Sequence, residues 1–207
     1  MPETDQTDDQ DEATEAARRE FWAKLRARHP AFTEAVLADA RITAQRRGER
    51  SEFRSRPDAA VQMIRLAVVS DAYLAQVLYR GKAALQAKGV PVLPRVLHRL
   101  AMMTAQVSIG DPVVIEAGVY FPHGQVVIDG VVEVGQGTSM APWSTIGLQA
   151  GSIFGPTIGR NVSIGTGSKL IGSITVGAGA KIGANAVVVH DVEPGATVVG
   201  VPARPIA

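Results

Sequence analysis

The second half of the sequence carries aliphatic residues at every sixth position, and this spacing constrains the fold more than any other feature. The clearest run is Val176, Ile182 and Val188, and the same step extends upstream to Ile158. A glycine often follows the aliphatic residue. A sandwich would show longer strands with alternating polarity at irregular spacing. A repeat of six residues instead predicts a β-solenoid, in which each unit is a short strand and a turn.

The spacing also predicts the shape of the solenoid. If three units form one coil, residues eighteen apart stack in the core, and their side chains point inward. Ile128, Ile146, Ile164 and Ile182 are all isoleucine at that separation. We therefore expect these four residues to form one inner column of a three-sided prism.

The six-residue step slips once. It runs through Ile109, Ile115 and Phe121, but the next aliphatic residue, Ile128, follows after seven residues, and the extra residue falls within "PHGQVV". One inserted residue re-aims side chains, and such bulges favour functional sites. His123 lies in this slip. From the residues alone it is equally well a working histidine or a solvated residue at a corner.

The first half of the chain has a helical pattern. Apolar residues recur at three and four positions in "FWAKLRARH", "FTEAVLADARITAQRR" and "LPRVLHRLAMMTAQ", and one longer stretch begins at Pro57 and ends near Gly89. The first fifteen residues are acidic and lack periodicity, which is typical of a disordered tail. We expect a tail over 1–15, a helical domain over 16–106 and the solenoid over 107–207.

Composition excludes several classes of function. The formal net charge of the 207 residues is +1, so no strong field favours nucleic acid or an anionic membrane as partner. No apolar run is long enough to span a bilayer, and the first residues lack the pattern of a secretory signal. We expect a cytoplasmic protein. The chain has no cysteine, which excludes thiolate chemistry and cysteine–zinc sites.

A zinc site or a nucleotide site is also not expected. A zinc site of imidazoles needs three of them, and only His123 and His190 lie in the repeat region, so we expect no metal. No glycine-rich nucleotide loop is present, which excludes a fused nucleotidyltransferase.

The repeat region, with "VYFPHGQVVIDG", "GAGAKIGANAVV" and "GVPAR", resembles the serine O-acetyltransferases among the hexapeptide-repeat acyltransferases. The last two motifs are typical of hexapeptide acyltransferases generally, and the segment around His123 narrows the resemblance to the serine acetyltransferase branch. Residues 30–106 resemble the helical domain of that family more loosely. The resemblance implies an α+β chain whose second domain is a left-handed parallel β-helix. It also implies a role in cysteine biosynthesis.

The resemblance implies that His123 is the general base. An alcohol is barely ionised at neutral pH, whereas an imidazole that titrates near neutrality takes its proton as the oxygen attacks the thioester of acetyl-CoA. The transfer would be direct, without a covalent enzyme intermediate. In the family an upstream aspartate orients the histidine. Ser108 stands at that position here, and Asp111 nearby is the candidate substitute.

In the family, CoA lies in a groove between the coils of adjacent subunits, so the resemblance implies a homotrimer or a dimer of trimers. The positions that match family residues near CoA are Lys169, Ala180, Lys181, Pro202 and Ala203. For the two lysines, the alternative is that they are solubilising residues in turns.

The sequence departs from the family where serine would bind. Pro122 replaces an aspartate, and Phe154 and Gly155 replace an arginine–histidine pair that contacts the serine carboxylate. In the family, this arginine–histidine pair lies in an excursion of the chain from the coil. Because Ile146 and Ile158 keep the six-residue register, we expect this excursion to be shortened here. A bidentate arginine is the usual partner of a carboxylate. Its loss favours an apolar or bulkier alcohol over free serine, with Trp143 and Phe154 as candidate substrate-binding residues, although Trp143 could equally be a corner packing residue.

We therefore expect an acetyl-CoA-dependent O-acetyltransferase of the serine acetyltransferase type, with serine as the acceptor that the family implies. One alternative is O-acetylation of a saccharide or a specialised metabolite by the same chemistry. Another is a catalytically silent assembly module whose helices recruit a partner.

Overall fold

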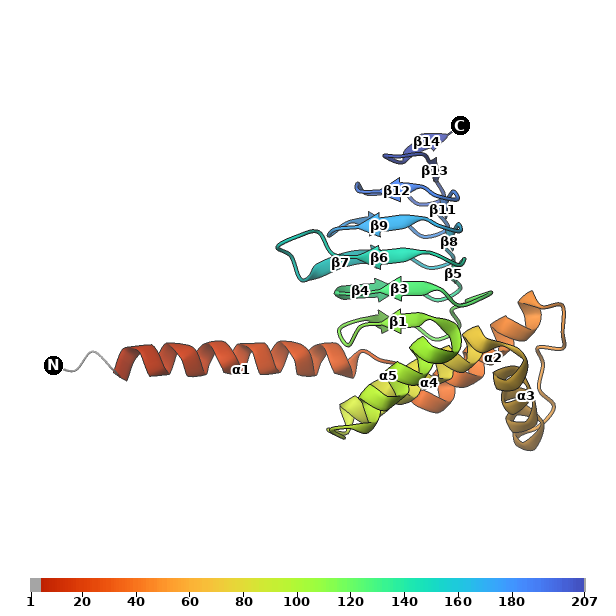
Figure 1. Cartoon of the computed structure of the whole chain (residues 1–207), viewed down its shortest axis with the longest axis horizontal. Coiled ribbons are helices and arrows are strands. Elements are labelled where there is room, and N and C mark those ends of the chain that lie inside the picture. Colours follow the sequence, from red (N-terminus) through yellow and green to blue (C-terminus); the bar gives the residue numbers. More distant parts are fainter. Residues whose placement is uncertain (1–4, 207) are drawn as a thin grey trace.

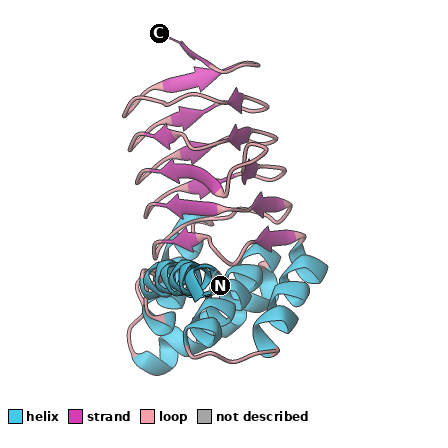
Figure 2. Ribbon diagram, turned by 90° about the vertical axis from the view of Figure 1, so that its left-hand side faces the viewer, coloured by secondary structure: helices cyan, strands magenta, loops and turns pink. Residues whose placement is uncertain are grey.

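The computed structural model describes residues 5–206, which form a base of helices and a prism of stacked coils (Figures 1 and 2). The helices are α1 (Asp5–Ala27), α2 (Phe32–Arg46), α3 (Arg56–Val69), α4 (Asp71–Ala87) and α5 (Leu93–Ala105). The last helix ends at Ala105 and the first strand begins at Val107, at the change of pattern in the sequence.

Helix α1 begins earlier than the sequence predicted. The expected tail over 1–15 is wrong for residues 5–15, which form the first part of this helix, and residues 1–4 lie outside the described residues. The helix has neither proline nor glycine between Asp5 and Ala27, and glutamate, glutamine, alanine and arginine are all good helix formers. Near the middle of the helix, Arg19 pairs with Glu15 one turn before it. In Figure 1 the helix extends away from the rest of the base.

The long helical stretch from Pro57 to Gly89 is two helices rather than one. Ser70 ends α3, where its N–H donates to the carbonyl of Leu66, and it also caps α4, where its hydroxyl accepts from the N–H of Tyr73 at 3.3 Å. The helix axes bend by 116° at this residue. Among the described residues, no single helix has the length and hydropathy needed to cross a membrane, and α3 and α4 pass that test only as a bent pair.

Short strands build the three sides of the prism. They are β1 (Val107–Ile109), β2 (Val114–Ile115), β3 (Val126–Ile128), β4 (Val131–Val134), β5 (Ser139–Met140), β6 (Thr145–Gly147), β7 (Phe154–Ile158), β8 (Ser163–Ile164), β9 (Lys169–Ile171), β10 (Thr175–Val176), β11 (Lys181–Ile182), β12 (Val187–Val188), β13 (Thr197–Val199) and β14 (Arg204–Ile206). Sheet A has the order β1-β3-β6-β9-β12, sheet B β10-β7-β4-β2 and sheet C β14-β13-β11-β8-β5. All neighbours are parallel except β14, which runs antiparallel to β13. The predicted solenoid is therefore confirmed.

Strand pairing confirms the slip of one residue. Ile109 pairs with Ile128, nineteen residues on, whereas Ile128 pairs with Ile146, eighteen residues on. The first coil thus contains one residue more than a regular coil of three hexads. The extra residue lies in the turn that holds His123.

The predicted column of four isoleucines is wrong. Ile146 pairs with Leu170 in sheet A, while Ile164 pairs with Met140 and Ile182 in sheet C. The coil between them contains an excursion over 148–153, which projects beyond β6 and β7 in Figure 1. Because this insertion has six residues, the aliphatic spacing passes through it unchanged. We expected the excursion to be shortened because the six-residue register is kept. The structure instead has a loop of six residues outside the coil.

Buried polar groups join the helical base to the first coil. The Asp39 carboxylate accepts from Arg80 Nε at 2.9 Å and from the N–H groups of Gly118 and Val119 at 2.8 and 3.2 Å. Arg80 also donates to the carbonyls of Ile115 and Glu116. An open end of a solenoid leaves backbone groups without partners. The helices close this end by supplying the missing donors and acceptors.

Candidate active site

His123 lies in an exposed turn between sheet C and sheet A. We call this side of the prism the CA edge; it consists of the corners 122–125, 141–144, 165–168 and 183–186. The neighbour Gly124 is buried, and an added Cβ there would lie 1.8 Å from the carbonyl oxygen of Ala105. Gln125 N donates to that same carbonyl at 2.9 Å. The end of α5 therefore holds this turn in place and leaves the imidazole exposed to solvent.

Four other predicted residues lie along the CA edge. Lys169 begins β9, and its ammonium donates to the carbonyls of Trp143 and Gly167 at 2.7 and 3.0 Å. The Trp143 side chain is 62% exposed. Pro202 and Ala203 reach the upper part of this edge, because Ala203 N donates to the carbonyl of Val187 at 2.8 Å.

Ala180 and Lys181 belong to a different edge. They lie where sheet B leads into sheet C, on what we call the BC edge, with corners 116–119, 135–138, 159–162 and 177–180. Ala180 is fully buried, while Lys181 is exposed as the first residue of β11. Sheet C separates these two residues from His123 within one chain.

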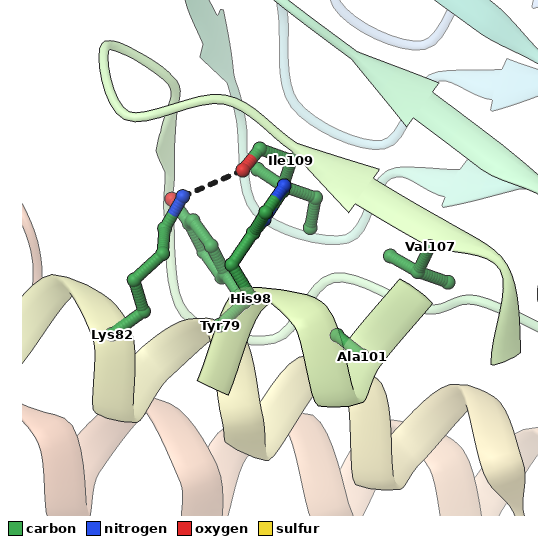
Figure 3. Close-up of a pocket in the computed structure, with 6 residues that line it drawn as sticks. All are labelled: Tyr79, Lys82, His98, Ala101, Val107 and Ile109. Carbon is green, nitrogen blue, oxygen red and sulfur yellow. Dashed lines mark hydrogen bonds between the residues drawn. The ribbon is translucent and has the colours of Figure 1, made fainter. Parts of the chain in front are cut away.

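Asp111 lies away from His123 and contacts another group. It follows β1, whereas His123 precedes β3, and these parallel strands pair side by side, so the two residues are at opposite ends of the pair. The Asp111 carboxylate accepts from Lys82 at 2.9 Å. Lys82 also donates to the carbonyl of Ile109 at 2.6 Å, as Figure 3 shows. Burial raises the pKa of Asp111, but the Lys82 ammonium outweighs it and holds this pKa below its usual range. Within one chain, the structure does not bring Asp111 to the imidazole.

Phe154 lies on the third edge, at the start of β7 and directly after the excursion. Its ring packs edge-on against Phe21 of α1, with the ring centroids 6.4 Å apart, and its side chain is 47% exposed. The structure therefore places Phe154 beside α1 and not beside Trp143.

A pocket of about 340 Å³ opens on sheet A beside the turn of His123. Its lining residues come from the CA edge and the adjoining strands: Gln106, Gln125, Val127, Trp143, Ser144, Thr145 and Lys169. Gln106 and Gln125 were not among the site residues predicted from the sequence. The available signal for Gln125 was its place at a corner, where the regular coils have glycine or asparagine, while Gln106 directly follows α5.

Family descriptions match two parts of the solenoid. "Bacterial transferase hexapeptide (six repeats)" matches residues 155–190, and "Hexapeptide repeat of succinyl-transferase" matches residues 106–121. Both matched ranges lie within the coils of the solenoid.

Curated relatives extend the comparison beyond the repeats. A serine acetyltransferase of Helicobacter pylori is 35% identical over 132 residues, which cover 62% of this chain and 77% of the relative. The chain belongs to the serine acetyltransferase family. A serine acetyltransferase of Synechococcus elongatus is 34% identical over 138 residues, or 65% of this chain and 56% of the relative. The chain thus spans little more than half the length of some serine acetyltransferases that it matches.

Solved structures of serine acetyltransferases have the same architecture. Soybean serine acetyltransferase in complex with serine superposes with a TM-score of 0.70 at 30% identity, covering 86% of this chain and 70% of that one. A serine acetyltransferase in complex with CoA gives a TM-score of 0.69 at 27% identity, covering 88% and 73%. The prism is accordingly the left-handed parallel β-helix of the serine acetyltransferase family.

Two positions at which the sequence was expected to differ from the family lie close to the pocket. Ser108, at the position of the expected orienting aspartate, pairs with Val127 in sheet A, and Val127 lines the pocket. Pro122, at the position of the expected serine-binding aspartate, precedes His123 in the same turn. Among the residues whose side chains the structure describes, no group of three or more histidine, aspartate and glutamate residues could hold a metal ion.

Proposed function

We propose that this chain transfers an acetyl group from acetyl-CoA to a hydroxyl group, as an O-acetyltransferase of the serine acetyltransferase type. The observation that carries the proposal is the exposed His123 in the bulged turn, beside a pocket, in a chain of this family. A boundary between a helical domain and the solenoid at 106/107 and a cytoplasmic site of action, where acetyl-CoA is available, belong to the same proposal.

The chemistry needs a base and a donor to an oxyanion. His123 takes the proton of the acceptor hydroxyl while its oxygen attacks the thioester carbonyl carbon. A backbone N–H of a neighbouring coil would stabilise the negative oxygen that forms there. The carbon–sulfur bond then breaks, and the imidazolium returns the proton to the thiolate. The products are an acetyl ester and free CoA, and no bond to the protein forms.

The distribution of residues over two edges supports assembly into a trimer or a dimer of trimers. His123 and Lys169 lie on the CA edge, whereas Ala180 and Lys181 lie on the BC edge. One CoA molecule can contact both sets if the CA edge of one subunit faces the BC edge of the next. We propose that CoA lies in this groove, with Pro202 and Ala203 at its upper end.

A thiol-release assay with acetyl-CoA and a panel of alcohols tests the proposed function. We expect CoA release that depends on the alcohol, and a loss of about 10²–10⁴-fold in kcat for His123→Ala. His190→Ala, in an exposed turn outside the site, is the matched control. Full activity of His123→Ala on a confirmed acceptor would show that another group is the base. Failure to bind CoA at all would favour the silent assembly module.

Asp111 is the part of the predicted site that the geometry supports least. Its carboxylate is hydrogen-bonded to the Lys82 ammonium. For Asp111 to orient His123, this hydrogen bond would have to break. Asp111→Asn separates the two roles. An orienting role lowers kcat and changes its pH profile, while a role in pairing Lys82 lowers only the thermal stability.

A further inference from the structure

Three large residues beside the CA edge have a left-handed backbone: Gln125 and Trp143 at corners of that edge, and Gln106 as the C-cap residue that ends α5. Helices commonly end on a left-handed residue, so the two corner residues are the unusual ones. The φ angles are 53° at Gln106, 58° at Gln125 and 65° at Trp143. One hydrogen bond links the corners of Gln125 and Trp143: Trp143 N donates to the carbonyl of Gln125 at 2.7 Å. Residues with a Cβ seldom adopt this conformation, and those that do are mostly asparagine or aspartate.

The other corners of the prism show what this backbone ordinarily carries. Above Trp143 on the CA edge, the left-handed residues are Gly167 and Asn185. On the BC edge they are Gly118, Gly137, Asn161, Gly179 and Gly195. Glycine or asparagine therefore meets the needs of the fold at such a corner. Backbone strain of this kind concentrates at functional sites.

All three side chains line the 340 Å³ pocket beside His123. The indole of Trp143 offers an exposed aromatic face, and each glutamine offers a carboxamide, which both donates and accepts hydrogen bonds. Lys169, the one charged residue of the lining, already donates to the carbonyls of Trp143 and Gly167. The pocket thus combines an aromatic face with neutral hydrogen-bonding groups, and its lining has no arginine to receive a carboxylate.

We propose that Gln106, Gln125 and Trp143 bind the acyl acceptor, and that this acceptor is a neutral, hydroxyl-bearing ring of the sugar class. The C–H bonds on one face of such a ring carry partial positive charge and stack on an indole, while its hydroxyl groups pair with the carboxamides. Gln125 and His123 share one turn, which brings a hydroxyl of the bound ring to the base. The reaction is that given above: a ring hydroxyl becomes an acetyl ester, and CoA leaves as the thiol. The inference rests on the proposed function and specifies its acceptor.

Calorimetric titration of the full chain tests the acceptor class independently of turnover. The probes are methyl α-glucopyranoside, methyl β-galactopyranoside, L-serine and CoA. We expect at least one glycoside to bind and L-serine to bind at least tenfold more weakly. Trp143→Asn keeps a residue suited to the left-handed corner but removes the indole, and should weaken glycoside binding at least tenfold while leaving the Kd for CoA unchanged. Gln106→Asn and Gln125→Asn should act in the same direction.

Asn161→Gly is the matched control, because it changes a left-handed corner on the BC edge and should leave glycoside binding unchanged. The proposal is overturned if neither glycoside binds, or if Trp143→Asn weakens CoA and not the glycoside, which would assign the pocket to the thioester arm. A glycoside that binds without any thiol release would contradict the proposed function alone. Acetylation of L-serine with neither glycoside bound would contradict the acceptor class alone.

Discussion

At the scale of single residues, the turn around His123 depends on a glycine. Gly124 has an ordinary backbone conformation, yet it is buried against the end of α5, where an added Cβ would lie 1.8 Å from the carbonyl oxygen of Ala105. That oxygen is also the acceptor of the hydrogen bond from Gln125 N. The glycine next to the histidine is therefore needed for close packing, and it determines where the imidazole lies.

Gly124→Ala should lower both stability and activity. The methyl group must push the turn away from α5, at a cost of about 1–3 kcal/mol in unfolding free energy. Gly147→Ala is the control, because an added Cβ there meets nothing within 4 Å. Denaturant unfolding of the two variants and their rates of thiol release measure the difference. Equal stability of the two variants would contradict a tightly packed turn.

His29 should make stability depend on pH. Burial, and then the positive charges of Arg80 and Lys82, lower its pKa from 6.5 to about 4. The unfolded chain therefore binds the proton first as the pH falls, so this contribution is complete above pH 6.5 and is lost progressively toward pH 4. We expect the unfolding free energy of the wild type to fall by about 1–3 kcal/mol more than that of His29→Gln over this range. Parallel stability curves for the two proteins would show that His29 titrates normally.

At the scale of elements, the excursion over 148–153 separates coils that are otherwise continuous. In regular coils, residues that pair between neighbouring strands are eighteen positions apart, as Ile164 and Ile182 are. Across the coil with the excursion the separation is twenty-four positions, as between Ile146 and Leu170. The extra residues leave the strand pairs on both sides in register. Surface loops of this kind are tolerated because they disturb few backbone hydrogen bonds.

Deletion of residues 148–153 should preserve the fold. In the shortened chain Ile158 follows Ile146 after six residues instead of twelve, so the six-residue repeat continues directly from β6 into β7. The contact of Leu148 with Gly130 is lost, and we expect a fall in Tm of only about 2–8 °C. Circular dichroism during heating measures this change. Loss of the cooperative transition would show that the excursion is part of the core.

At the scale of the whole molecule, the prism places the predicted CoA-contacting residues on two edges. A single chain cannot bring these edges together, because sheet C lies between them. Helices close the first coil through Asp39 and Arg80, and the antiparallel β14, with Pro205 at its centre, covers the last strand of sheet C. Proline on an edge strand discourages further pairing. Both ends of the stack of coils are thus covered, and the sides of the prism stay open to a neighbouring subunit.

Mixed oligomers test whether one site takes residues from two subunits. His123→Ala and Lys181→Glu should each be nearly inactive as separate proteins. If each site takes His123 from one subunit and Lys181 from the next, random mixing of equal amounts restores about one quarter of the wild-type sites. Co-expression with two affinity tags and a thiol-release assay measures this recovery. No recovery in verified mixed oligomers would place both residues in a site within one chain.

The sequence by itself determined the solenoid, the slip of one residue and the position of His123 within that slip. Six-residue periodicity reports which side chains point inward, and this depends only on local spacing. The same periodicity missed the excursion, since an insertion of one whole hexad leaves the spacing intact, and it misplaced Ile146 and Ile164 in one column. Only the tertiary structure assigned Asp111 to Lys82 and brought Gln106, Gln125 and Trp143 to one pocket, because those contacts join corners and helices that are distant in the chain.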